Sequence, residues 1–402
     1  MHDRLPRFFS APAALGLVLA LSGAACATNL DRYAALIDDG WAEQAKAELA
    51  EVVKREKDNA RAHYLLAKAS VKLGDYETAD KHSEQAIKLE ENAIYLLMRG
   101  DSVGLRARHG SKIKAIGRAK KCVAAYTRAA EIDPDNLKAR VSVFAFNREA
   151  PGIAGGNKDR ARAQLPEIAR IKPMWGYFFR ALWAIEMDED RAEADRELFA
   201  AMAAYPDSHE PYDEYAKYLR RFDEPDSVVH YYREGIRRNP EPAGAHESLG
   251  SLLMQMERYD EAEAEFRAAL AADPTYLSAW TALSLNHQAQ QQWDQALKVL
   301  DELQQAHPDY RPALYQRGRA QLLAEQDLAA AEAALRAYLA GPINTRWPSR
   351  AAAHWRLAQV LEKRYRYQEA FQEITMATEL QPAVKQYKKD RGRLESMARD
   401  DY

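Results

Sequence analysis

The sequence repeats one pattern of small, large and proline residues every 34 residues, and this repetition constrains the fold more than any other feature. The pattern is clearest in three windows, 243–276, 277–310 and 351–384. Its positions are Leu249, Gly250, Tyr259, Ala262, Phe266, Ala269 and Pro274 in the first window, Trp280, Leu283, Trp293, Ala296, Leu300, Leu303 and Pro308 in the second, and Leu357, Ala358, Tyr367, Ala370, Ile374, Ala377 and Pro382 in the third. Such a period indicates a stack of similar units.

The residue types in the pattern indicate that each unit is a pair of helices. Small residues such as Gly250 and Ala262 let two helix backbones approach closely, while Leu249 and Phe266 fill the space beside the crossing. A proline such as Pro274 cannot continue the second helix and sets the turn into the next unit. One such pair cannot bury its apolar face alone, so the units must stack into a continuous curved rod.

The remaining windows follow the pattern with varying regularity. Windows 174–208, 209–242 and 60–93 keep the register, and 28–59 keeps it loosely. The register stretches by about nine residues in 94–136, by an insertion at 149–157 and by a longer loop at 341–349. We expect a final helix from Val384 to about Met397, polar on one side, to cap the stack.

The repeated pattern resembles the tetratricopeptide repeat (TPR) family over nearly the whole chain after residue 27. The resemblance implies an all-α fold, an α-solenoid of about ten helix–turn–helix repeats with a C-terminal capping helix. We divide the chain into a signal peptide (1–27), irregular TPR-like repeats with insertions (28–206), a regular TPR array (207–382), and a capping helix with a tail (383–402).

The first 27 residues have the layout of a bacterial secretory signal peptide. Arg4 and Arg7 precede an apolar stretch at 13–21, and small residues follow. Cleavage after Ala27 predicts a soluble periplasmic protein. The segment 23–26 also resembles a lipobox, which would make Cys26 a lipidation site and the protein an outer-membrane lipoprotein. No later stretch has the roughly 20 apolar residues that a transmembrane segment needs.

Composition and motifs argue against catalytic, metal and cofactor sites. Lys and Arg number 57 against 60 Asp and Glu, a net charge of −3, so we expect no nucleic-acid partner. Two cysteines exclude an all-cysteine metal site, and Cys122 is interpreted as a buried small residue. His63, His246 and His354 recur at one packing position and are expected to make interhelix contacts. The aromatic residues at 175–183 are expected to fill the core. We therefore predict no catalytic residue, no metal and no cofactor.

Two local features stand out from this background. Residues 102–130 contain eight basic side chains and no acidic one: Arg106, Arg108, Lys112, Lys114, Arg118, Lys120, Lys121 and Arg128. This basic segment is either a solvated helix face or a docking surface for an anionic partner. The glycine-rich loop 150–157 precedes a helix expected near Lys158, and it either permits a wide turn or binds an anion at the helix start.

In TPR solenoids the first helix of each repeat lines the concave face, where ligands usually bind. Mapped onto this sequence, that groove consists of Tyr64, Lys68, Arg148, Tyr177, Arg180, Asp213, Lys217, Arg220, Arg221, Gln288, Tyr315, Arg319 and Trp355. Arginine and aromatic side chains suit peptide recognition. The Lys/Asn/Arg clamp that some TPR domains use to hold an acidic C-terminus is not filled here.

These features predict a non-enzymatic TPR scaffold or adaptor that binds a peptide or protein partner in the bacterial cell envelope. Two alternatives stay open. One is a lipid-anchored accessory protein of an outer-membrane, pilus or secretion assembly. The other is a regulatory partner of an envelope hydrolase.

Overall fold

The computed structural model describes residues 29–239 and 241–400, and within these residues every regular element is a helix. There are twenty-two α-helices and one short 3₁₀ helix, and the α-helices form ten successive groups closed by a last helix. The predicted all-α solenoid of about ten repeats is confirmed. The proposed signal peptide and Cys26 lie outside the described residues.

The first half of the chain contains the irregular repeats. Its helices are α1 (Leu30–Asp38), α2 (Ala42–Arg55), α3 (Ala60–Lys72), α4 (Tyr76–Leu89), α5 (Ala93–His109), α6 (Lys112–Ile132), α7 (Leu137–Glu149), η1 (Gly152–Ala154), α8 (Lys158–Arg162), α9 (Gln164–Ile171), α10 (Pro173–Met187) and α11 (Arg191–Ala204). The two register shifts are visible here. Helices α5 and α6 are 17 and 21 residues long, and the second helix after α7 is split into α8 and α9.

The second half contains the regular repeats. Its helices are α12 (Glu210–Leu219), α13 (Pro225–Ile236), α14 (Ala243–Gln255), α15 (Tyr259–Ala272), α16 (Leu277–Ala289), α17 (Trp293–Ala306), α18 (Pro312–Ala324), α19 (Leu328–Leu339), α20 (Arg350–Lys363), α21 (Tyr367–Leu380) and α22 (Lys385–Asp400). The crossing of α14 and α15 shows why the small residues are needed, because a Cβ atom added to Gly250 would lie 2.7 Å from the Phe266 ring.

Local sequence explains where many helices begin and end. The side chains of Asn59, Asn92 and Asn136 each accept a hydrogen bond from a backbone N–H in the first turn of the helix that follows. Pro274 and Pro308 lie two residues after the ends of α15 and α17, in the turns to the next repeats, as the sequence predicts.

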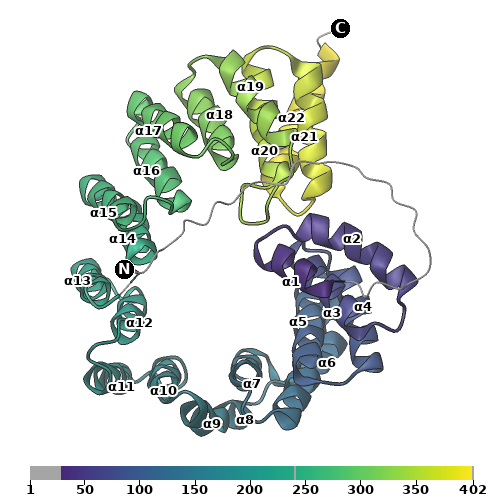
Figure 1. Ribbon diagram of the computed structural model, residues 1–402, viewed down its shortest axis with the longest axis vertical. Coiled ribbons are helices and arrows are strands. Elements are labelled where there is room, and N and C mark those ends of the chain that lie inside the picture. Colours follow the sequence, from purple (N-terminus) through teal and green to yellow (C-terminus); the bar gives the residue numbers. More distant parts are fainter. Residues whose placement is uncertain (1–28, 240, 401–402) are drawn as a thin grey trace, which may run out of the picture.

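The repeats curve into a ring, and the first helix of each pair lies on its inner side (Figure 1). Helices α12, α14, α16 and α18 border the central opening, while α13, α15, α17 and α19 lie outside them. The two ends of the solenoid meet where the turn between α1 and α2 lies beside the loop before α20. The expected curved rod is therefore bent until its ends touch.

Hydrogen bonds from the backbone of Thr345 and the side chain of Asn344 close the ring across about three-quarters of the sequence. The backbone N–H of Thr345 donates to the Gly40 carbonyl at 2.8 Å, and the Asn344 amide donates to the Asp39 carbonyl at 2.7 Å. The Trp41 and Trp347 rings pack edge to face with centroids 5.3 Å apart. Gly40 has φ +92°, and a Cβ atom there would overlap the Asn344 side chain. The loop 341–349, noted in the sequence only for its length, thus joins the last repeats to the first.

Candidate partner-binding surface

A pair of arginines on the inner side of the C-terminal repeats forms the most distinctive polar site of the ring. Arg319 lies on α18 and Arg356 on α20, so adjacent first helices present them. Arg319 donates a hydrogen bond to the side-chain carbonyl of Gln288, on α16. Arg356 donates to Gln359 at 2.9 Å, and its Nε is buried without a hydrogen-bond partner. Among the described residues, neither guanidinium has a carboxylate partner.

The two like charges are close enough to disturb each other. Burial lowers the pKa of Arg319, and the positive charge of Arg356 lowers it further. Placing two positive charges together in a half-buried position costs free energy unless an anion compensates them. The pair is therefore a ready binding site for a carboxylate, which guanidinium groups hold with two parallel hydrogen bonds.

Aromatic side chains surround this arginine pair. The Arg356 guanidinium lies over the Trp355 ring, 4.4 Å from its centroid, and the Trp355 indole N–H donates to Asp390 at 2.8 Å. The Tyr387 ring packs against Trp355, and Tyr315 is buried beside Tyr338. These contacts fix the rotamers around the two arginines, so the site is rigid before a ligand arrives.

The structure brings together four of the groove residues predicted from the sequence and adds one that the sequence analysis missed. Gln288, Tyr315, Arg319 and Trp355 are the predicted members, and Arg356 is the addition. The two arginines occupy different positions in their repeats, because Arg319 directly follows Gly318 whereas Arg356 precedes the matching Ala358 by two residues. A comparison of equivalent repeat positions therefore could not predict that these two arginines lie close together.

A second group of predicted groove residues forms ion pairs between neighbouring first helices. Arg148 on α7 and Arg221 after α12 both contact the Glu186 carboxylate of α10, at 2.8 and 2.7 Å. Arg180 binds Glu197 through two hydrogen bonds of 2.8 Å. Arg148 and Arg221 thus link neighbouring first helices, whereas Arg180 links the two helices of one repeat, and the charges of all three are already compensated.

The remaining predicted groove residues are spread along the inner helices. Three of them are held by local contacts, since Tyr177 lies under the Arg180 guanidinium, Lys68 binds Asp38 at 2.5 Å and Tyr64 stacks on Tyr95. Asp213 accepts a hydrogen bond from His209 at 2.7 Å.

Two exposed cations complete the set of predicted groove residues. Lys217 is exposed and lies 3.5 Å from the Glu214 carboxylate. Arg220 is exposed and has no hydrogen bond or ion pair within the parts of the chain that the structure describes.

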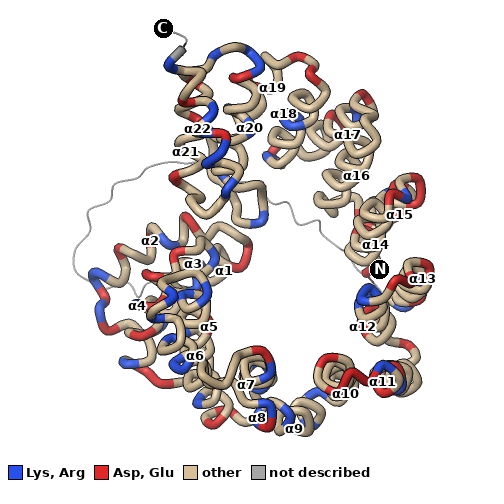
Figure 2. The backbone as a smooth tube through the Cα atoms, turned by 180° about the vertical axis from the view of Figure 1, so that it is seen from behind, with Lys and Arg blue, Asp and Glu red and all other residues tan. Residues whose placement is uncertain are grey.

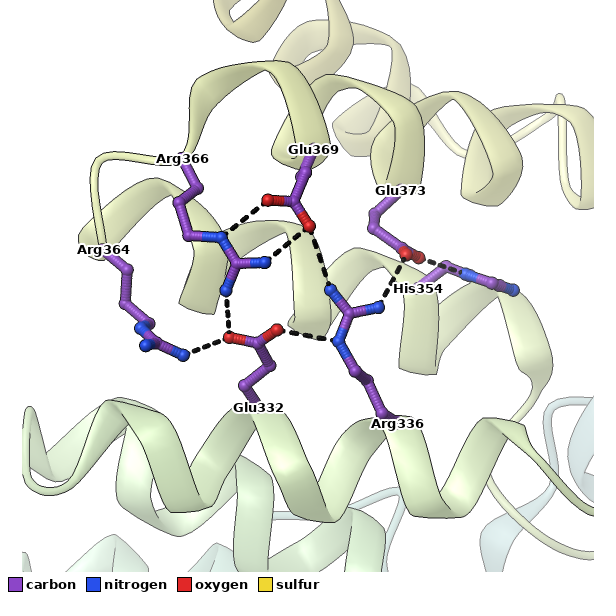
Figure 3. A network of polar contacts seen from close by, with 7 residues as sticks. All are labelled: Glu332, Arg336, His354, Arg364, Arg366, Glu369 and Glu373. Atoms are coloured by element: carbon purple, nitrogen blue, oxygen red, sulfur yellow. Dashed lines mark hydrogen bonds and ion pairs between the residues drawn. The ribbon is translucent and has the colours of Figure 1, made fainter.

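The outer side of the same repeats gives a useful contrast, because its charges are paired. Figure 3 shows Arg336, Arg364 and Arg366 converging on Glu332, with the Arg336 and Arg366 contacts at 2.7 and 2.6 Å. Burial opposes ionisation of Glu332, but the hydrogen bonds from Arg336 and Arg366 outweigh it and lower the pKa of this carboxyl. Over the whole ring, acidic and basic residues are intermixed (Figure 2).

The expected structural histidines are confirmed. His63, His246 and His354 each contact the residue 19 positions later, on the second helix of the same repeat: His82 at 2.8 Å, Glu265 at 2.7 Å and Glu373 at 2.5 Å. Cys122 is a buried free thiol, and the aromatic segment contributes Trp183 and Phe179 to the core, as predicted. Among residues 29–239 and 241–400, no three His, Cys, Asp or Glu side chains gather in a metal-binding arrangement.

The structure of the loop 150–157 agrees with the interpretation that its glycines permit a wide turn. Gly155 has φ +101°, and a Cβ atom on Gly156 would overlap the Ala150 carbonyl, so glycine is required for the turn itself. The helix that follows, α8, has five residues, and the side chain of Asn157 caps it.

Comparisons with known proteins agree with this architecture. Tetratricopeptide repeat models match residues 60–92, 216–276 and 253–322. One similar solved structure is yeast Tom70, which is 13% identical in sequence. Its alignment with this protein covers 92% of this chain and 88% of the Tom70 chain, with a TM-score of 0.49. PilW, a type IV pilus biogenesis factor, is 19% identical and covers 54% of this chain and 98% of its own with a TM-score of 0.40.

No curated protein matches the sequence. None of the described helices combines the length and apolar character needed to cross a membrane. TPR proteins are typically non-enzymatic scaffolds for protein–protein interactions. The matched models together cover residues 60–92 and 216–322, and over these residues the chain is similar to tetratricopeptide repeat proteins.

Proposed function

We propose that this protein is a scaffold that binds an acidic segment of a partner protein on the inner side of the ring, at Arg319 and Arg356. The observation that carries the proposal is the pair of neighbouring guanidinium groups of Arg319 and Arg356, which donate to the neutral side chains of Gln288 and Gln359 but have no carboxylate partner among the described residues. A glutamate, an aspartate or a C-terminal carboxylate would supply the missing charge.

Preorganisation is the physical basis of this binding. The first helices already hold the two arginines and Trp355 in place, so the ordering cost falls almost entirely on the partner. Relief of the repulsion between Arg319 and Arg356 adds to the gain. An acidic segment bound here would therefore dissociate more readily as salt concentration rises.

We further propose that the scaffold acts in the bacterial cell envelope, after export by residues 1–27. The apolar stretch at 13–21 between basic and small residues supports this proposal. Cell fractionation tests it, because the exported protein should be found in the periplasm. Incorporation of labelled palmitate that is lost in Cys26→Ala would instead indicate the lipid-anchored alternative, and recovery from the cytoplasm alone would reject export.

Selection from a random peptide library tests the arginine site directly. Wild-type protein should enrich peptides that carry Asp, Glu or a free C-terminal carboxylate. The double variant Arg319→Gln with Arg356→Gln should lose this enrichment, and binding of the selected peptides should weaken by about tenfold or more, as expected for loss of charge-assisted hydrogen bonds.

A matched control uses two cations on outer helices, Arg267 on α15 and Lys298 on α17. Arg267→Gln with Lys298→Gln removes the same net charge and should leave the enrichment intact. Equal enrichment by wild type and the inner-face variant would contradict the proposed site.

A further inference from the structure

The two insertions of the irregular half together build a pocket of about 680 Å³. It lies between the extended helices α5 and α6, the end of α7 and the turn at 150–154. Its lining includes Gly104, Leu105, Ile116, Ala119, Cys122 and Phe146. A pocket of this size with mostly apolar walls is typical of a site for a small ligand.

The interior of the pocket offers a ligand few free hydrogen-bonding groups. The Tyr126 hydroxyl donates to Asp101 at 2.7 Å, and Lys138 contacts the same carboxylate at 3.2 Å. Glu149, at the edge, is paired with Arg148 at 2.6 Å. Burial raises the pKa of the Cys122 thiol to about 11, so this group stays neutral.

This inventory favours one kind of ligand. An extended peptide in the pocket would leave its backbone N–H and carbonyl groups without partners, which is costly. A hydrocarbon chain has no such groups, so it gives up no hydrogen bonds when it enters the pocket.

The rim of the pocket, in contrast, carries free positive charge. Three members of the basic segment have partners, since Arg106 binds Asp80 and Glu77, Arg128 binds Glu91, and Arg118 donates to the Arg106 carbonyl. The side chains of the other five make no hydrogen bond or ion pair to any residue that the structure describes: Arg108, Lys112, Lys114, Lys120 and Lys121.

Arg108 lines the pocket itself. Lys112 lies four residues before Ile116 on α6 and so shares its helix face. The positive side chains are therefore placed where the polar end of a bound chain would emerge. Ile113 and Ile153, 94% and 68% exposed, add apolar surface on the same two segments.

We propose that this pocket binds an acyl chain with an anionic head group, the chain lying between α5, α6 and α7 and the head group contacting Arg108. The charge complementarity at the rim and the small number of free polar groups inside together define this ligand class. The site lies on other repeats than Arg319 and Arg356, so it stands or falls independently of the proposed partner binding.

Titration calorimetry of the full chain with laurate tests the proposal. Laurate below its micelle concentration should bind with a one-to-one ratio, whereas dodecyltrimethylammonium, a cation of equal chain length, should bind at least about tenfold more weakly. Arg108→Gln, a change on an exposed side chain, should weaken laurate binding by about tenfold. Lys114→Gln, which removes an equal charge outside the pocket lining, should change it little.

A pocket-filling variant provides a second, independent readout. Ala119→Trp should abolish laurate binding, while Ala124→Trp, at an exposed position of the same helix outside the lining, should preserve it. Equal binding of the anionic and cationic amphiphiles, or laurate affinity unchanged in both Arg108→Gln and Ala119→Trp, would overturn the proposal. So would binding of an acidic amphipathic peptide by a protein that does not bind laurate.

Vesicles distinguish the two sources of such a ligand. Co-sedimentation with phosphatidylglycerol vesicles, lost in Ala119→Trp and not seen with phosphatidylcholine, would assign the head group to a bilayer lipid. Laurate binding without co-sedimentation would assign the site to a free monoacyl anion.

Discussion

The regular repeats at 209–380 and the irregular repeats at 93–171 are built from the same kind of helix pair but differ in helix length and in the size of their cores. In the regular half, helices of 10 to 14 residues stack over core clusters that run from Ala181 to Val299 and from Tyr315 to Leu394. In the irregular half, the two clusters around Val143 and Phe144 are smaller, and α6 extends 21 residues.

The difference shows that lengthening a repeat reduces how well its helices are covered by their neighbours. A lengthened helix can have an end turn that no neighbour covers, and Ile113, in the first turn of α6, is 94% exposed. The side chains of Lys112 and Lys114, in the same segment, form no ion pair with any residue that the structure describes. The regular half thus contributes stability and a rigid inner face, whereas the irregular half contributes a pocket and unpaired charge.

The largest expected difference between the halves concerns core truncation. Phe266 is fully buried against Gly250, so Phe266→Ala should lower the free energy of unfolding by about 3–5 kcal/mol. Ile116 lines the open pocket and is 42% exposed, so Ile116→Ala should change it by less than about 0.5 kcal/mol. Urea unfolding followed by circular dichroism measures both, and equal losses would contradict the distinction.

A smaller difference is expected for charge removal. Glu332 accepts hydrogen bonds from three arginines, so Glu332→Gln should cost about 2 kcal/mol of unfolding free energy. Lys114 has no such partner in the described residues, and Lys114→Gln should leave stability within about 0.5 kcal/mol of wild type. Thermal unfolding of the two variants compares them, and an unchanged midpoint in Glu332→Gln would show that the network of Figure 3 adds no stability.

The smallest effect is expected for His82, the partner of His63 in the repeat at 60–93. Burial, and then the neighbouring charge of His63, lowers the pKa of His82 to about 4. Between pH 6.5 and 4, His82 is protonated in the unfolded chain but neutral in the folded chain. The contribution of the neutral His82 to the free energy of unfolding is therefore fully present above pH 6.5 and is lost as the pH falls to about 4.

His82→Gln should remove that part of the pH dependence, about 1–2 kcal/mol after allowance for solvent screening. His246 occupies the position of His63 in its own repeat, and its partner there is the Glu265 carboxylate and not a second imidazole. Unfolding measured between pH 7 and pH 4 should show a flatter profile in His82→Gln than in wild type. Parallel profiles for His82→Gln and wild type would contradict this assignment.

The sequence predicted the repeats well because their determinants are local. Gly250, Phe266 and Pro274 act within one helix pair, and their spacing alone defines it. The same holds for His246 and Glu265, which lie 19 residues apart.

Contacts between distant segments could not be read in the same way. The electrostatic repulsion between Arg319 and Arg356 depends on how two first helices pack. The contact of Asn344 with the turn at Asp39 and Gly40 depends on the summed curvature of all repeats. The sequence marked the loop 341–349 only by its length, and nothing local indicated that it reaches the first repeat. Small rotations per repeat decide whether a solenoid ends as an arc or a ring.

Closure of the ring is the central claim, and small-angle X-ray scattering of Gly40→Ala tests it most directly. Gly74→Ala is the control, because Gly74 also has a positive φ, +74°, but has only the Tyr76 hydroxyl near the position of an added Cβ, at 3.9 Å. Wild type and Gly74→Ala should scatter as a closed ring. Gly40→Ala should separate the ends and increase both the radius of gyration and the maximum dimension. Identical profiles for Gly40→Ala and wild type, or an open-arc profile for wild type itself, would contradict the account.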